Sequence, residues 1–134
     1  MAALNPRLFP RAVMQEVSWS FIGAPFTSRV EFEKELREAQ HGDAPAGWEP
    51  TDLIILAPEI QVQYMYWEAD VQHQPTIVLR AAAGAFTGVE LLFLLHNALV
   101  EQLRDMDHHF FEGLHLARPA KAGQAPLYRL AQGS

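Results

Sequence analysis

The chain has 134 residues, enough for one compact domain, and its 49% hydrophobic and 19% charged residues exclude an intrinsically disordered protein. Its formal net charge of −6, with lysines and arginines dispersed along the chain, disfavours nucleic-acid binding because such a protein repels phosphate groups. The chain has no cysteine, which excludes disulfides, thiolate metal sites and cysteine nucleophiles.

No membrane-spanning helix is predicted, since the longest apolar run, Leu91 to Leu95, is far too short to cross about 30 Å of hydrocarbon. The first residues also lack the basic stretch, apolar core and cleavage site that are typical of a secretory signal peptide. We therefore expect a cytoplasmic protein with no membrane partner, folded as a single domain over residues 1–134.

The first predicted element is a strand over residues 13–21, in which apolar side chains alternate with polar ones. One face of this strand is expected to be buried, with Val13, Val17, Trp19 and Phe21 pointing inward.

A helix is predicted next, because Ser28 and Glu31 have the spacing of a capping box at a helix start. It should run to about Gln40, and its many charged residues indicate a helix that is mostly exposed to water. The glycines and prolines of residues 41–47 predict a helix stop and a loop.

The middle of the chain predicts three strands. Leu53 to Leu56 is apolar throughout and indicates a short buried strand between two prolines. Residues 60–67 alternate in the manner of a strand, and a second strand from Thr76 to Ala82 follows a predicted turn at Ala69 to Pro75. These last two strands are expected to form an antiparallel hairpin.

The strongest local signal is a second capping box, Thr87 with Glu90, in which Phe86 and Leu91 have the positions of a hydrophobic staple. A core helix should begin there and run to Arg104. A step of about 100° per residue places Glu90 on its polar side and His96 within its apolar side. A buried His96 needs a hydrogen-bond partner, for which a backbone carbonyl or a tyrosine is expected.

Two last strands, over residues 109–116 and 127–131, should form a second hairpin. The whole pattern predicts an α+β fold, with a predominantly antiparallel β-sheet of five or six strands packed against one core helix and with a second, more exposed helix.

A cluster of histidines and carboxylates lies between residues 105 and 115. We interpret it mainly as a polar turn after the core helix, where such side chains bind the local backbone or solvent. As alternatives, His109 and His115 are candidate metal ligands, and six residues are candidates for acid–base catalysis. These six are His96, His108, His109, His115, Asp107 and Glu112. In a regular strand, His109 and His115 would share a face with Phe111, and Glu112 would point the other way.

An aromatic and acidic segment at the end of a predicted strand is the candidate partner-binding site. Trp67 is followed by Glu68 and Asp70, and Trp48 is a further candidate anchor in the preceding loop. Aromatic residues are favoured at interface hot spots, and carboxylates suit a basic partner. Core packing is nevertheless the first interpretation of these aromatics, and an interface is the sharper one.

The sequence contains no phosphate-binding loop, dinucleotide fingerprint, nucleophile elbow or zinc-protease motif, and no cofactor is predicted. It therefore favours a non-enzymatic protein-binding domain, such as a small cytoplasmic inhibitor or immunity-type protein, acting on a basic partner or through self-association. The alternative is a small enzyme or ligand-binding protein with a histidine and carboxylate pocket.

Overall fold

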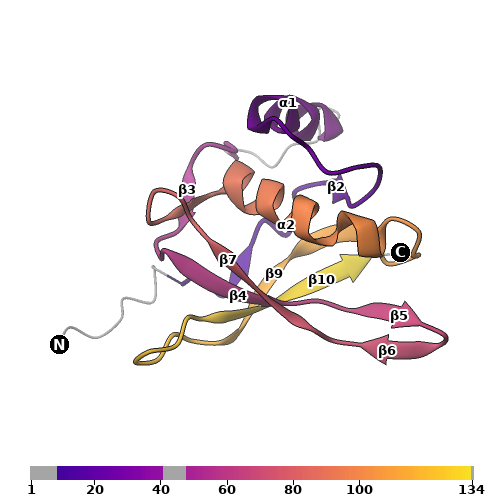
Figure 1. Ribbon diagram of the computed structural model, residues 1–134. Coiled ribbons are helices and arrows are strands. Elements are labelled where there is room, and N and C mark those ends of the chain that lie inside the picture. Colours follow the sequence, from indigo (N-terminus) through magenta and orange to yellow (C-terminus); the bar gives the residue numbers. More distant parts are fainter. Residues whose placement is uncertain (1–8, 41–47, 134) are drawn as a thin grey trace.

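The computed structural model describes residues 9–40 and 48–133, and it has the predicted α+β architecture. A six-stranded sheet packs one face against helix α2, Gly88–Leu103. Helix α1, Arg29–Ala39, lies on the far side of α2 from the sheet (Figure 1). None of the helices in the described ranges is long and apolar enough to span a membrane.

The main sheet is mixed, although nearly all its strand pairs are antiparallel. Its order is β1 (Ala12–Val13), β9 (Phe110–Arg118), β10 (Leu127–Gly133), β4 (Glu59–Gln63) and β7 (Thr76–Arg80), and β2 (Trp19–Ser20) also pairs with β9. Among the described strands of this sheet, only β10 and β4 pair in parallel. Two small sheets pair β3 (Leu53–Ile55) with β8 (Phe86–Thr87) and β5 (Tyr66–Glu68) with β6 (Val71–His73).

The prediction of one continuous strand over residues 13–21 is wrong, because the chain leaves the sheet between β1 and β2. Met14 has a φ of 55°, which an extended strand does not allow. The predicted inward face is nevertheless confirmed, since Val13, Val17, Trp19 and Phe21 are all buried. Burial therefore follows the alternation even where strand pairing does not.

Helix α1 begins and ends as predicted, with Ser28 accepting a hydrogen bond from the Glu31 amide at 3.3 Å and Gln40 at its C-terminal end. The predicted loop over residues 41–47 lies outside the described residues.

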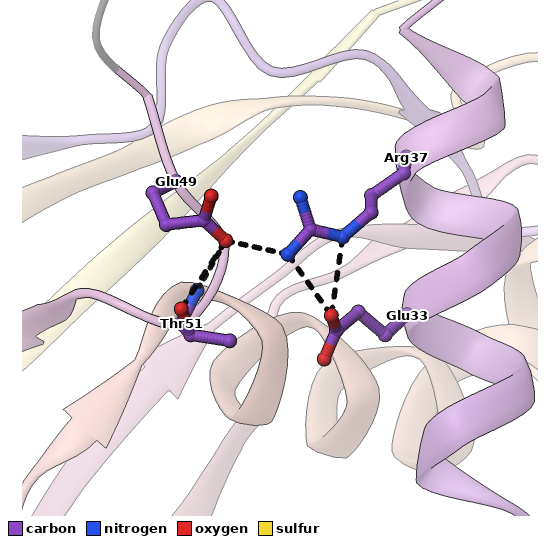
Figure 2. Close-up of polar contacts among 4 residues, drawn as sticks. All are labelled: Glu33, Arg37, Glu49 and Thr51. Atoms are coloured by element: carbon purple, nitrogen blue, oxygen red, sulfur yellow. Dashed lines mark hydrogen bonds and ion pairs between the residues drawn. The ribbon is translucent and has the colours of Figure 1, made fainter.

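Arg37, in the last turn of α1, connects this helix to the segment before β3. Its guanidinium donates to Glu33 at 3.0 Å and to Glu49 at 2.5 Å, and Glu49 also accepts from Thr51 (Figure 2). The hydrogen bond from Arg37 lowers the pKa of the Glu49 carboxyl. Because these groups are exposed, the network positions α1 more than it stabilises the fold.

Helix α2 is the predicted core helix. The Thr87 hydroxyl accepts from the Glu90 amide at 3.1 Å, which confirms half of the capping box, and both Phe86 and Leu91 are fully buried. The other half is wrong. Glu90 is only 7% exposed rather than on a polar face, and its carboxylate accepts from the Ala82 amide at 3.3 Å. Glu90 thus ties the start of α2 to the chain that follows β7.

The middle strands need two further corrections. Leu53 and Leu56 are 58% and 47% exposed, so the segment predicted as a buried strand is an edge with only Ile55 in the core. The predicted hairpin of residues 60–67 and 76–82 is confirmed as an antiparallel pairing of β4 and β7. Its turn is much shorter than predicted, because β5 and β6 continue the hairpin as far as Ala69 and Asp70, which have φ of 51° and 64°.

Candidate partner-binding surfaces

An open groove lies between α1 and the edge of the sheet, with a volume of about 650 Å³. We call it the α1 groove. Its walls come from α1, from the β2 segment and from the start of β9. The lining residues are Ser18, Trp19, Ser20, Ile22, Phe26, Glu35, Glu38, Ala39, Phe110 and Phe111. Ile22 and Phe110 are 53% and 41% exposed, so this groove offers apolar side chains to solvent beside the carboxylates of α1.

The floor of the α1 groove is held by His96, which is completely buried in α2. The Trp19 indole N–H donates to His96 Nδ1 at 3.2 Å, and His96 Nε2 therefore donates to the Ala24 carbonyl at 2.9 Å. The predicted pairing of His96 with a backbone carbonyl is confirmed. Burial lowers the pKa of His96, against smaller opposing effects of the Ala24 hydrogen bond and the Glu35 charge. A neutral imidazole is the form that this site requires.

Two side-chain amides hold the walls of the groove. Gln40 accepts from the Ser18 amide at 3.0 Å and donates to the Ser18 carbonyl at 2.9 Å, so it occupies the place of a neighbouring strand at this sheet edge. Asn97 of α2 makes the equivalent pair of bonds with the backbone of Phe26, at 2.8 and 2.9 Å. Both contacts satisfy and fix backbone groups of segments that line the groove.

A second hollow, of about 340 Å³, lies where the hairpin meets the turn after α2, and it is lined by Trp67, Asp105, Met106, Asp107 and His108. The half-buried Trp67 ring lies against the His108 ring, with centroids 4.8 Å apart. His108 Nδ1 is buried and has no hydrogen-bond partner among the described residues. The predicted partner-binding segment at Trp67 and the histidine and carboxylate cluster after α2 therefore meet at one surface.

Gln132 of β10 holds these two segments together. Its side-chain amide accepts from the Met65 amide at 2.7 Å and donates to the carbonyls of Met65 and His108, at 3.0 and 2.9 Å. A hydrogen bond from the Tyr64 hydroxyl to Gln102 of α2 attaches the same hairpin to the core helix. The position of Trp67 is thus set by polar contacts that are distant in sequence.

The predicted group of Trp67, Glu68 and Asp70 is divided between two sides of the hairpin. Trp67 pairs with Gln72 and Tyr66 with His73, and the Tyr66 and His73 rings are stacked 4.8 Å apart. Since side chains alternate along a strand, Glu68 lies on the side of Tyr66. Glu68 and Asp70 are exposed at the tip, while the carboxylates beside Trp67 come from Asp105 and Asp107.

No known protein family, curated protein or solved structure matches this chain. The assignment of a function therefore depends on the surfaces themselves.

The remaining candidate residues of the cluster are dispersed. His109 Nδ1 bonds the Met106 carbonyl, as expected for a polar turn, whereas His115 is exposed on β9. The prediction that His115 shares a face with Phe111, opposite to Glu112, is wrong, because Gly113 forms a bulge with a φ of 105°. Phe111 and Leu114 are both buried as a result, and Glu112 and His115 are both exposed. Within the described ranges, no group of three or more ligand-type side chains is placed to hold a metal.

Trp48, the other predicted anchor, packs against the core and is half-buried. Its indole nitrogen is buried without a partner in the described part of the chain.

The α1 groove was not predicted from the sequence. Ile22 belongs to an apolar stretch and Phe110 to a predicted strand, and in both places a core position would be expected. The one available signal was Glu35 and Glu38, which follow one another at helical spacing on the same side of α1.

Proposed function

We propose that this protein is a non-enzymatic protein-binding domain whose α1 groove receives an apolar side chain flanked by lysine or arginine residues of a basic partner. The observation that carries this proposal is the exposure of Ile22 and Phe110 in a preformed groove beside Glu35 and Glu38. An aromatic and an aliphatic side chain in such a hollow gain apolar contact when a partner covers them.

The charges of the groove support a basic partner. Neither Glu35 nor Glu38 forms an ion pair within the described residues, whereas Glu33 on the same helix is paired with Arg37. Uncompensated carboxylates at the rim of an apolar site speed the encounter with a cationic segment and disfavour acidic competitors. The contact would thus combine an apolar anchor at the centre with ion pairs at the edge.

The rigid floor favours binding without rearrangement. The Trp19 side chain is fixed by His96 and the Phe26 backbone by Asn97, so these two parts of the groove lose little conformational entropy when a partner binds. A small acidic domain of this kind suits the role of an inhibitor or immunity-type protein, which acts by covering a functional surface of its partner.

The alternative of a small enzyme requires that candidate catalytic residues converge. Of the six candidates, Asp107 and His108 line one hollow, His96 is sealed under the α1 groove, and His115 lies on β9. This dispersion favours the binding hypothesis over catalysis by these residues.

The test is affinity capture from the native host, followed by reconstitution with the purified captured protein. The bait carrying Glu35→Lys and Glu38→Lys should lose a stoichiometric partner that the unmodified bait retains. A matched control, Glu68→Lys with Asp107→Lys, makes the same change of charge at the hairpin and should retain it. Equal capture by the groove variant, or loss with the hairpin variant alone, would refute the assignment of the groove.

A further inference from the structure

One face of the main sheet carries no helix in the described part of the chain, because α1 and α2 both lie on the other side (Figure 1). The residues of β4 show this alternation clearly. Ile60 and Val62 are buried under α2, and Gln61 and Gln63, between and after them, are partly exposed on the open side. This open side is formed by β9, β10, β4 and β7.

Two arginines lie on this surface, held by glutamines rather than by carboxylates. Arg129 donates to Gln63 at 3.1 Å, and Arg118 donates to Gln61 at 3.4 Å. Within the described residues neither arginine has a carboxylate within ion-pair distance, whereas Arg80 on the same sheet is paired with Glu59 at 2.9 Å. We call this surface, with Arg118, Arg129 and the adjoining His115, the arginine face.

The arginine face has two further features of an unfilled interface. The Nε atom of Arg118 is buried without a hydrogen-bond partner among the described residues, so this guanidinium is only partly satisfied within that part of the chain. Val78 of β7, which pairs with Gln61 across the sheet, is 49% exposed. A cationic centre thus lies beside an apolar side chain.

The opposite charge gathers at the end of the molecule where the hairpin extends beyond the sheet (Figure 1). Four carboxylates occupy two turns there, and none of them forms an ion pair within the described ranges. They are Glu68 and Asp70 at the hairpin tip and Asp105 and Asp107 after α2. The contact of Trp67 with His108 joins the two turns, and Val71 at the tip is 56% exposed. We call this region the acidic end.

We propose that the protein self-associates head to tail, with the acidic end of one copy bound to the arginine face of the next. The carboxylates of the hairpin meet the uncompensated guanidinium groups, and Val71 meets Val78. The acidic end protrudes past the sheet, so it can reach another copy's open face while its own arginine face stays free. Such a heterologous contact closes into a ring or continues as a filament.

The size of the contact indicates its strength. With about 4.8 Å between strands and about 3.3 Å per residue, four strands of five residues offer roughly 320 Å². A stable interface covers about 800 Å² on each partner, so this association should be weak and should depend on protein concentration. Because exposed charges carry it, salt should weaken it further.

The experiment is sedimentation velocity of the purified chain over a range of concentrations, at low and at high salt. The average mass should rise with concentration at low salt and return to that of the monomer at high salt. A mass that stays monomeric at every concentration in low salt would overturn the proposal.

Charge reversal identifies the two surfaces. Arg118→Glu with Arg129→Glu, or Glu68→Lys with Asp107→Lys, should each weaken self-association about tenfold or more, and a mixture of the two variants should associate again. Failure of the mixture to associate, with both variants shown to be folded by circular dichroism, would refute this pairing of surfaces. Arg129→Glu alone gives a milder version if the double arginine variant does not fold.

This inference goes beyond the proposed function and fails separately from it. Glu35→Lys with Glu38→Lys changes the charge by the same amount in the α1 groove and should leave self-association intact. If that variant abolished self-association, the contact would belong to the groove and the proposed pairing would be wrong.

Discussion

Replacement of His96 tests the polar core under the α1 groove. In His96→Leu the indole N–H of Trp19 loses its acceptor in a buried site, while the carbonyl of Ala24, an exposed residue, regains water. An unsatisfied buried donor costs about 1–3 kcal/mol, so the variant should be destabilised by about that amount at pH 7.5. In His96→Gln the amide can still accept and donate, which makes it the control with a smaller loss.

The pH dependence of this effect has a definite sign. Burial lowers the pKa of His96 in the folded protein, so below pH 6.5 the unfolded chain binds a proton that the folded chain does not. Stability from the neutral imidazole is complete above about pH 6.5 and falls by at most about 1.4 kcal/mol per pH unit below it. Neither variant has an imidazole at position 96, so neither loses stability for this reason. The difference in free energy of unfolding between the unmodified protein and each variant should therefore shrink between pH 6.5 and 5.

The assay is urea unfolding of all three proteins at pH 7.5, 6.5, 5.5 and 5.0. Glu49 does not interfere, because the lowered pKa of its carboxyl makes stability fall only below about pH 4.5. The reasoning would be refuted by a stability difference between His96→Leu and the unmodified protein that stays constant from pH 7.5 to 5. It would also be refuted if His96→Leu were as stable as the unmodified protein at pH 7.5.

Four other substitutions test the fold by thermal or urea unfolding. Leu99→Ala should cost about 2–5 kcal/mol, because Leu99 is fully buried in α2. Its control, Val30→Ala, lies at a site that is 80% exposed and should change stability by less than about 0.5 kcal/mol. Similar values for the two variants would contradict this placement of α2. Ala69→Gly should stabilise the protein by about 0.5–1 kcal/mol, since Ala69 has a φ of 51° at the hairpin tip, and a loss of stability would argue against that turn. Gly113→Ala should destabilise by about 1–3 kcal/mol, because its φ is 105° and a Cβ atom would lie 2.9 Å from Gln15 Cα; an unchanged midpoint would show that the bulge is absent.

The helices could be predicted because their signals are local. Ser28 and Thr87 each stand three residues before a glutamate, and both hydroxyls accept a hydrogen bond from that glutamate's amide in the structure. The position of His96 in the apolar side of α2 followed from helical periodicity alone. The hairpins followed from alternation, which records burial on one side of a strand.

Other features could not be predicted because they depend on residues far apart in the sequence. Gln132 joins Met65 to His108, and Gln40 takes the place of a strand beside Ser18, yet nothing local distinguishes either glutamine from a surface residue. The burial of Glu90 depends on the amide of Ala82, which only the fold brings near. The bulge at Gly113 was not predicted, because its effect on the alternation appears only with the strands in register.

Hydrogen exchange on the reconstituted complex with the captured partner tests the proposed function most directly. Binding in the α1 groove should slow exchange in residues 18–22, in the last turns of α1 and in residues 109–111, with little change at the hairpin tip. Protection confined to residues 66–73 and 104–108, with the groove segments exchanging as they do in the free protein, would contradict the proposal.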